Sequence, residues 1–242
     1  MELTIAHLYP DSMSLYGEYA NVAVLRRHLE TMGVTATVRD FTCEDILDFS
    51  DADFIYMGAG TERRQKSVLI AAPHYAPALK AAVERGAVVL FTGNAMATLG
   101  ASVTDAKGKV WPGFALADYT TKESDSWRDP HDVLAHSSLW DSEVIGFMNK
   151  CSTTHGVTTP LFEHVKGFGN EESCEPEGYV SGNVFATHLT GPVLVKNPDF
   201  LDLIIRRLFE ARGWDVPERL PVLPHEREAY AVTLRELQAR IK

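Results

Sequence analysis

The chain has 242 residues, of which 45% are hydrophobic, and this suits one large α/β domain, or a domain with an appendage, with a sizeable core. Its formal net charge of -10 argues against nucleic acid or an anionic membrane surface as the main partner. The three cysteines form no CxxC pair, and no apolar run has the length of a membrane span. We therefore expect a cytoplasmic protein without a disulfide framework or membrane insertion.

The N-terminal half alternates predicted strands and helices. Strands are expected at residues 3–8, 35–40 and 53–57, with a short helix or turn at 46–49. One helix is expected at residues 21–32. A second begins near residue 64, is interrupted around Pro73 and Pro77, and resumes up to residue 85. This order and spacing predict a parallel sheet covered on both faces by helices.

The stretch AVVLFTGNAMATLG (87–100) combines a buried strand, a tight turn and a helix start. In open α/β sheets such a turn lies at the carboxyl end of a strand, where ligands bind and where an elbow presents a nucleophile. Gly93 can adopt the left-handed backbone of an elbow, but it brings no reactive side chain. Thr92 and Asn94 are poor substitutes for a thiol. We therefore expect the shape of a catalytic elbow without its chemistry.

From residue 102 the pattern changes to short strands joined by polar loops. A hairpin turn is expected at 105–108, and strands at 114–120, 143–148, 161–165 and 184–188 form an antiparallel extension of the same sheet. A helix follows at 197–213, and a proline-rich link leads to a last helix. We divide the chain into a domain at 1–213 and a link with C-terminal helix at 214–242. This last helix either docks on its own domain or binds a partner, and its apolar stripe is Tyr230, Leu234, Leu237 and Ile241.

Six spaced segments carry a resemblance to a known family. They are LYPDSMSLYGEYANVAVLRRHLETMG (8–33), GAGTERRQ (58–65), WPGFALADYTTKESDSWR (111–128), GFMNK (146–150), VKGFGNEE (165–172) and GNVFATHLTGPVLVKNP (182–198). In this order they resemble the CobB/CobQ-like class I glutamine amidotransferases, most of all the glutaminase subunits (GatD) of lipid II isoglutaminyl synthase. The resemblance implies a flavodoxin-like α/β fold, no cofactor or metal, and a Mur-ligase-like (MurT-like) partner in cell-wall precursor amidation.

Two departures from the family pattern concern its chemistry. The family elbow is close to ICGGYQLLG, so an overlay on TGNAMATLG places Gly93 at the nucleophilic cysteine. In the family segment GTYLHGP the general-base histidine precedes the second glycine, and here Thr190 takes that position. Glutamine hydrolysis of this type needs both a thiolate and an imidazole. Gly93 and Thr190 are therefore expected to be vestigial catalytic positions.

Five residues are candidates for a remaining ligand site: Arg128, Gly58, Gly60, Asn94 and His188. Arg128 falls where the resemblance places an arginine that engages substrate glutamine, and a guanidinium suits a carboxylate. The alternative for Arg128 is a structural salt bridge. His188 lies two residues from Thr190 on the same strand face, so it is either a displaced base or a satisfied buried histidine.

Two further groups have simpler interpretations. Cys151 and His155 are four residues apart in an irregular segment, which is typical of a free cysteine rather than a nucleophile. The basic cluster of Arg63, Arg64 and Lys66 is typical of a solvated helix start rather than a phosphate site.

Three functions stay open at this point. The first is a glutaminase-dead subunit that binds a Mur-ligase-like partner, as a scaffold or regulator, or for a ligase that uses free ammonia. The second is an active glutaminase that delivers ammonia to that partner. The third is a stand-alone protein that binds glutamine or another small amino acid through Arg128.

Overall fold

A computed structural model describes residues 1–171, 176–223 and 225–240. Cys174, Ile241 and the Glu172 end of the fifth family segment lie outside the described residues. Within the described ranges, no helix is both long enough and apolar enough to cross a membrane.

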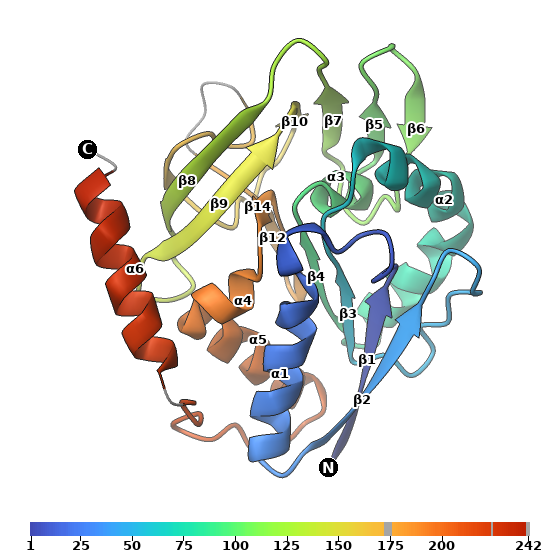
Figure 1. The fold of residues 1–242 in the computed structure, drawn as a ribbon. Coiled ribbons are helices and arrows are strands. Elements are labelled where there is room, and N and C mark those ends of the chain that lie inside the picture. Colours follow the sequence, from blue (N-terminus) through green and yellow to red (C-terminus); the bar gives the residue numbers. More distant parts are fainter. Residues whose placement is uncertain (172–175, 224, 241–242) are drawn as a thin grey trace.

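The central sheet has six strands in the order β12-β13-β4-β3-β1-β2, and all neighbours are parallel except β12 and β13 (Figure 1). Its inner strands β3 and β4 are buried at every position, because helices cover both faces. The strand bounds are Glu2–Leu8 for β1, Thr35–Phe41 for β2, Phe54–Met57 for β3, Val88–Thr92 for β4, Tyr179–Ser181 for β12 and Val184–Thr187 for β13. The parallel sheet predicted from the alternating pattern is thus confirmed.

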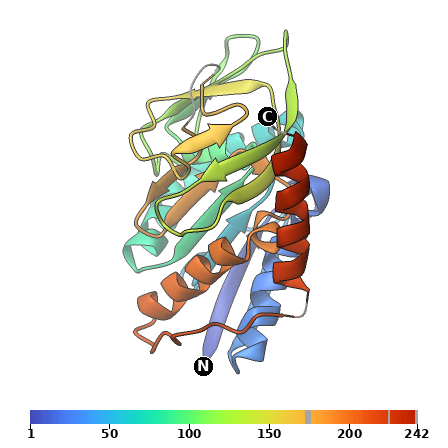
Figure 2. The ribbon, with the colours of Figure 1, turned by 90° about the vertical axis from the view of Figure 1, so that its left-hand side faces the viewer.

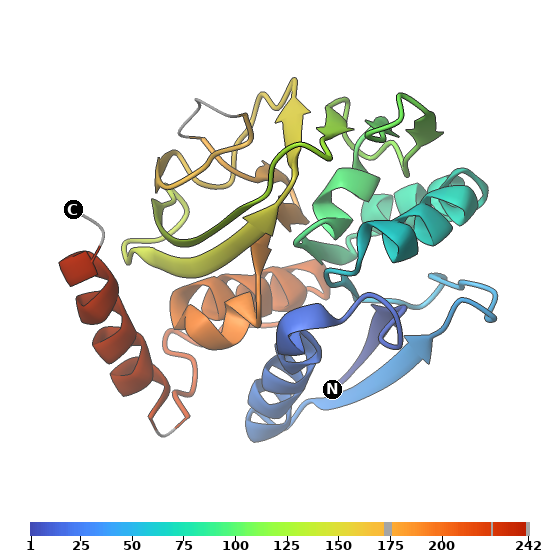
Figure 3. The ribbon, with the colours of Figure 1, turned by 45° about the horizontal axis from the view of Figure 1, so that its top comes forward.

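Successive side chains of each strand point to opposite faces, and this alternation divides the core in two. Figure 3 shows the helices that cover the two faces lying on either side of the central strands. On one face, Phe54, Val88 and Leu90 pack with α1 (Tyr19–Thr31), α4 (Val193–Lys196) and α5 (Pro198–Ala211). On the other face, Ile55, Val89 and Phe91 pack with α2 (Glu62–Glu84) and α3 (Ala95–Leu99).

Most antiparallel strands do not extend the central sheet, which gains only β12 from them. They form two separate four-stranded sheets, ordered β10-β7-β5-β6 and β11-β8-β9-β14. The expected hairpin turn at 105–108 is present between β5 and β6. The bounds are Ser102–Thr104 for β5, Val110–Pro112 for β6, Thr120–Glu123 for β7, Asp129–His136 for β8, Val144–Lys150 for β9, Ser152–His155 for β10, His164–Lys166 for β11 and Leu189–Thr190 for β14.

Three local predictions are wrong, and two more are wrong in part: residues 161–163 precede β11, and residues 152–155, expected to be irregular, form β10. Residues 114–119 form no strand, because their backbone caps the end of α3. The N–H groups of residues 114, 115 and 116 donate to the carbonyls of residues 98, 100 and 99, respectively. Residues 46–49 form neither helix nor turn. Helix α2 is continuous through Pro73 and Pro77, since both are exposed on the outer face, where water can solvate the carbonyls that lose their partners.

The last helix, α6 (Glu226–Arg240), lies against the side of β8 and β9 (Figure 2). Leu237 is buried there against Leu134 and Ile145. The Tyr230 hydroxyl donates to the Glu143 carbonyl at 2.6 Å. The division of the chain at residue 213 stays a prediction.

Candidate functional site

The elbow has the geometry expected from its sequence. Strand β4 ends at Thr92, one residue beyond Phe91, and Gly93 follows with φ +59°. Helix α3 begins at Ala95, as predicted. The Gly93 N–H donates to the Leu189 carbonyl at 3.0 Å, so the elbow is tied to the segment that carries Thr190.

The backbone around Gly93 leaves no space for a side chain. A Cβ built at Gly93 would overlap the Cβ of Ala59 and lie 3.2 Å from Thr190 Cγ2. Ala59 falls on the second glycine of the family pattern GGGQDxxQ. The methyl group of Ala59 therefore occupies the volume into which a nucleophile at residue 93 would project.

Asn94 ties the elbow to the glycine turn that carries Gly60. The Gly60 N–H donates to Asn94 Oδ1 at 2.9 Å, and Asn94 Nδ2 donates to the Gly60 carbonyl at 2.8 Å. A backbone N–H at the end of a strand is the kind of donor that stabilises an oxyanion. Here the Gly60 N–H is already engaged.

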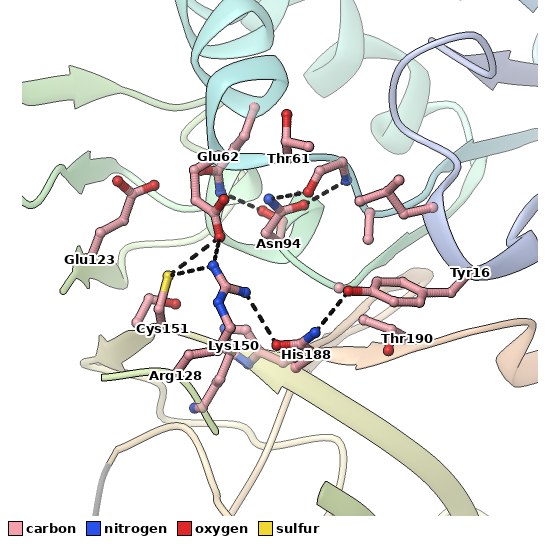
Figure 4. Close-up of a pocket in the computed structure, with 17 residues that line it drawn as sticks. Tyr16, Thr61, Glu62, Asn94, Glu123, Arg128, Lys150, Cys151, His188 and Thr190 are labelled. Atoms are coloured by element: carbon pink, nitrogen blue, oxygen red, sulfur yellow. Dashed lines mark hydrogen bonds and ion pairs between the residues drawn. The ribbon is translucent and has the colours of Figure 1, made fainter. Parts of the chain in front are cut away.

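A cavity of about 280 Å³ opens above the elbow (Figure 4). Gly60, Asn94, Arg128 and His188 border it, together with the vestigial positions Gly93 and Thr190. Gly58 does not line it. This glycine packs beneath, where a Cβ would meet the Glu18 side chain and the Met13 carbonyl.

A chain of polar contacts crosses this cavity (Figure 4). Asn149 Nδ2 donates to the Tyr16 hydroxyl at 2.8 Å, and Arg128 Nη1 donates to Asn149 Oδ1 at 3.2 Å. Arg128 Nη2 contacts Cys151 Sγ at 3.4 Å and forms an ion pair with Glu62. Burial raises the pKa of Glu62, but the hydrogen bond and charge of Arg128, a backbone hydrogen bond and the Cys151 thiol together outweigh burial and hold that pKa below its usual value. Arg128 thus points into the cavity with its charge neutralised by Glu62.

Cys151 is the one thiol beside the cavity among the described residues, and its surroundings keep it protonated. Burial raises the pKa of Cys151 to about 11, and the Glu62 carboxylate adds to the effect. A reactive cysteine needs the opposite environment, with its pKa lowered. Cys151 is therefore poorly suited to replace the nucleophile missing at residue 93.

Neither Thr190 nor His188 has a free group for proton transfer. The Thr190 hydroxyl donates to the Phe147 carbonyl at 3.1 Å. His188 is 1% exposed, with Nδ1 at 3.0 Å from Glu177 Oε1 and Nε2 at 3.2 Å from Thr154 Oγ1. Burial lowers the pKa of His188, as does the nearby Lys150 ammonium. This geometry favours the satisfied buried histidine over the displaced base.

Glu18 is an internal carboxyl that the sequence did not point out. It is fully buried beneath the elbow and accepts hydrogen bonds from the Ala59 N–H, from the Thr92 hydroxyl at 3.0 Å and from the Gly191 N–H at 3.1 Å. Burial raises the pKa of Glu18 to about 8, although these donors oppose it. Its place directly after Gly17, in a loop that follows the first strand, was the available signal.

Two more polar residues beside the cavity were also missed. Gln65 Nε2 donates to the Asn94 carbonyl at 2.7 Å, and Glu123 forms an ion pair with Lys66 at 3.3 Å. Both residues border the cavity and are buried. Gln65 falls on the last residue of the family pattern GGGQDxxQ, which was the signal for it.

Comparisons with known proteins agree with this architecture. The CobB/CobQ-like glutamine amidotransferase domain matches residues 4–198. The chain is 26% identical over 212 residues to the subunit GatD of the glutamine-hydrolysing lipid II isoglutaminyl synthase of Staphylococcus aureus, covering 88% of this chain and 86% of the relative. It is 28% identical over 218 residues to the subunit of the same name from Streptococcus pneumoniae. That match covers 89% of this chain and 84% of the relative.

Solved structures match the fold. A crystal structure of a glutamine amidotransferase superposes with a TM-score of 0.54 at 12% identity, covering 86% of this chain and 98% of that one. The glutaminase domain of Trypanosoma brucei CTPS with bound acivicin superposes with a TM-score of 0.50 at 11% identity. That match covers 90% of this chain and 98% of that domain.

Proposed function

The chain belongs to the CobB/CobQ-like glutamine amidotransferase family, and from this premise we propose that it is an amidotransferase-like subunit without glutaminase activity. One observation carries the proposal: Gly93 stands at the tip of the elbow, and Ala59 fills the volume that a nucleophilic side chain would need. Two neighbouring features support it. The Gly60 N–H is engaged by Asn94, and the Thr190 hydroxyl is engaged by the Phe147 carbonyl.

The partner is inferred from the relatives. Both GatD subunits are named as parts of lipid II isoglutaminyl synthase. We propose that this chain likewise acts with a Mur-ligase-like subunit in cell-wall precursor amidation, as its scaffold or regulator, or for a ligase that takes free ammonia. An active glutaminase remains the second candidate because Cys151 borders the cavity. A stand-alone amino-acid-binding protein is the third, because Arg128 points into the cavity.

The first experiment measures ammonia release from glutamine by the purified chain, alone and with a co-expressed Mur-ligase-like subunit. We expect no release above background, because the loss of a nucleophile and its base lowers such rates by several orders of magnitude. A glutamine-hydrolysing GatD subunit serves as the positive control. Turnover that disappears in Cys151→Ala would contradict the proposal and establish the second candidate.

A further inference from the structure

A second cavity, of about 540 Å³, lies on the ribbon of β7 and β10, the two neighbouring strands at the top of the molecule in Figure 1. Among the described residues, only Glu123 borders both this cavity and the one above the elbow. The side chains that matter for its chemistry are Lys122, Thr153, His155 and Glu171, all of which line it.

Three of these side chains form a chain from a hydroxyl through an imidazole to a carboxylate. Thr153 Oγ1 lies 2.9 Å from His155 Nε2, and His155 Nδ1 lies 3.2 Å from Glu171 Oε2. Because an ionised carboxylate only accepts hydrogen bonds, Nδ1 of the neutral imidazole carries the hydrogen, and Nε2 accepts from the Thr153 hydroxyl. In this arrangement a histidine can remove the proton of a hydroxyl while a carboxylate orients the histidine.

Strand geometry brings these groups together with a cation. Thr153 and His155 are two residues apart on β10, so their side chains point to the same face. The antiparallel register sets Lys122 of β7 directly opposite Thr153, and side chains of opposite residues share a face with their Cβ atoms about 5 Å apart. An ammonium group at this position suits the negative charge that develops on a carbonyl oxygen under attack by Thr153.

A second chain of the same kind lies in the interior and shows the importance of access. Thr154 Oγ1 lies 3.2 Å from His188 Nε2, and His188 Nδ1 lies 3.0 Å from Glu177 Oε1. Thr154 and Glu177 are fully buried, so no substrate reaches that hydroxyl. The chain of Thr153 differs because it borders a cavity and the side chains of His155 and Glu171 are both exposed.

We infer that the β7–β10 cavity is a site for hydrolysis of small esters, with Thr153 as the nucleophile, His155 as its base and Glu171 as a positioning residue. Thr153 Oγ1 attacks the ester carbonyl and forms a new C–O bond while its proton moves to His155 Nε2. The bond to the alcohol then breaks, and the alcohol oxygen takes this proton. Water, with His155 again as the base, releases the acid and restores the hydroxyl. The site uses no residue of the elbow, so it goes beyond the proposed function and does not depend on it.

The test incubates the full chain with 4-nitrophenyl acetate, follows the release of 4-nitrophenolate and locates acetyl groups by peptide mass spectrometry. We expect a rate that saturates with substrate, and an acetyl group on Thr153. Thr153→Val keeps the shape of the side chain and should lower kcat/KM about 100-fold, the value of a positioned base acting on its nucleophile. Thr153→Ser keeps the hydroxyl and should retain turnover.

The matched control is His225→Ala, because His225 is also exposed and its Nδ1 lies 3.3 Å from Glu228 Oε2. This control should leave the rate unchanged. An equal rate in wild type and Thr153→Val, an equal loss in His225→Ala, or acetyl groups on lysines but not on Thr153 would each overturn the inference, because any exposed imidazole or amine could then account for the release.

Glu171 is tested through the split between kcat and KM. Glu171→Gln should lower kcat about fivefold, the value of an exposed ion pair, and leave KM unchanged, because the carboxylate stabilises an imidazolium that forms only during the reaction. Glu171→Asp should restore part of the loss. A change in KM alone would show that Glu171 contacts the substrate and would contradict its positioning role.

Discussion

Single residues decide the chemistry of the elbow, and three of them, Gly93, Ala59 and Asn94, depend on one another. Gly93 has φ +59°, which a side chain tolerates poorly, and the methyl group of Ala59 lies where that side chain would begin. Asn94 then holds the glycine turn against the elbow through two hydrogen bonds. Restoring a thiol at residue 93 therefore requires a change on the opposite turn as well.

Gly93→Cys should lower the free energy of unfolding by about 2–4 kcal/mol, because a left-handed non-glycine backbone and an overpacked contact each cost about 1–3 kcal/mol. Adding Ala59→Gly should restore the part of the free energy of unfolding that the overpacked contact removes. A double-mutant cycle in urea, with Ala59→Gly alone as control, measures the coupling. Additive effects would show that Ala59 does not exclude a side chain.

The same single variant should release no ammonia from glutamine. Thr190 has no group that accepts a proton from a thiol, and both ring nitrogens of His188 are engaged. Turnover by Gly93→Cys would mean that His188 or another group acts as the base.

Glu18 should make stability depend on pH. Burial raises its pKa from 4.5 to about 8, so between these values the folded state keeps a proton that the unfolded chain has released. Stability from this group is complete below about pH 4.5 and falls as pH rises through 8, by at most about 1.4 kcal/mol per pH unit. Denaturation at several pH values should give Glu18→Gln a flatter profile than wild type. Glu2→Gln, an exposed control, should follow wild type.

At the scale of elements, α6 is held by one buried leucine, by the half-buried Tyr230 and Leu234, and by several polar contacts. Leu237 packs on Leu134 and Ile145, and His28 Nε2 lies 2.8 Å from Glu226. Most other α6 side chains are exposed. This small interface suits a helix that opens locally while the sheet stays folded.

Leu237→Ala should lower the opening free energy of α6 by about 2 kcal/mol, at the low end for a buried leucine because the site lies at the edge of the molecule. Native-state hydrogen exchange should show faster exchange in α6 and unchanged exchange in α5. Val232→Ala removes an exposed apolar side chain from the same helix and is the control. Equal acceleration in α5 would show that α6 unfolds only with the whole domain.

At the scale of the whole molecule, the role of the chain in amidation depends on the proposed Mur-ligase-like partner. If the chain serves a Mur-ligase-like subunit that takes free ammonia, the co-expressed complex should amidate lipid II with ammonium chloride and ATP but not with glutamine and ATP. Omitting this chain should lower the rate or the yield of the ligase subunit. Mass spectrometry of the reaction product measures the amidation from each nitrogen source. Amidation from glutamine at a comparable rate would contradict the proposal.

The sequence by itself determined the elbow and the family. A run of apolar residues before Thr92-Gly93-Asn94 and small residues after it are local signals, so the strand, the turn and the start of α3 could be predicted. The absence of a thiol at Gly93 and of an imidazole at Thr190 could also be read from the family segments. These features depend on residues that are close together in the chain.

Only the tertiary structure decided what surrounds the elbow. Ala59 meets Gly93, Glu18 lies beneath the elbow, and burial beside Glu62 keeps Cys151 protonated. Each of these contacts joins segments far apart in the chain. The prolines of α2 stay in one helix because its outer face is exposed, which a local pattern does not encode. The contact of His155 with Glu171 likewise exists only where β10 meets the loop that follows β11, because hydrogen bonding between separate segments is a property of the assembled fold.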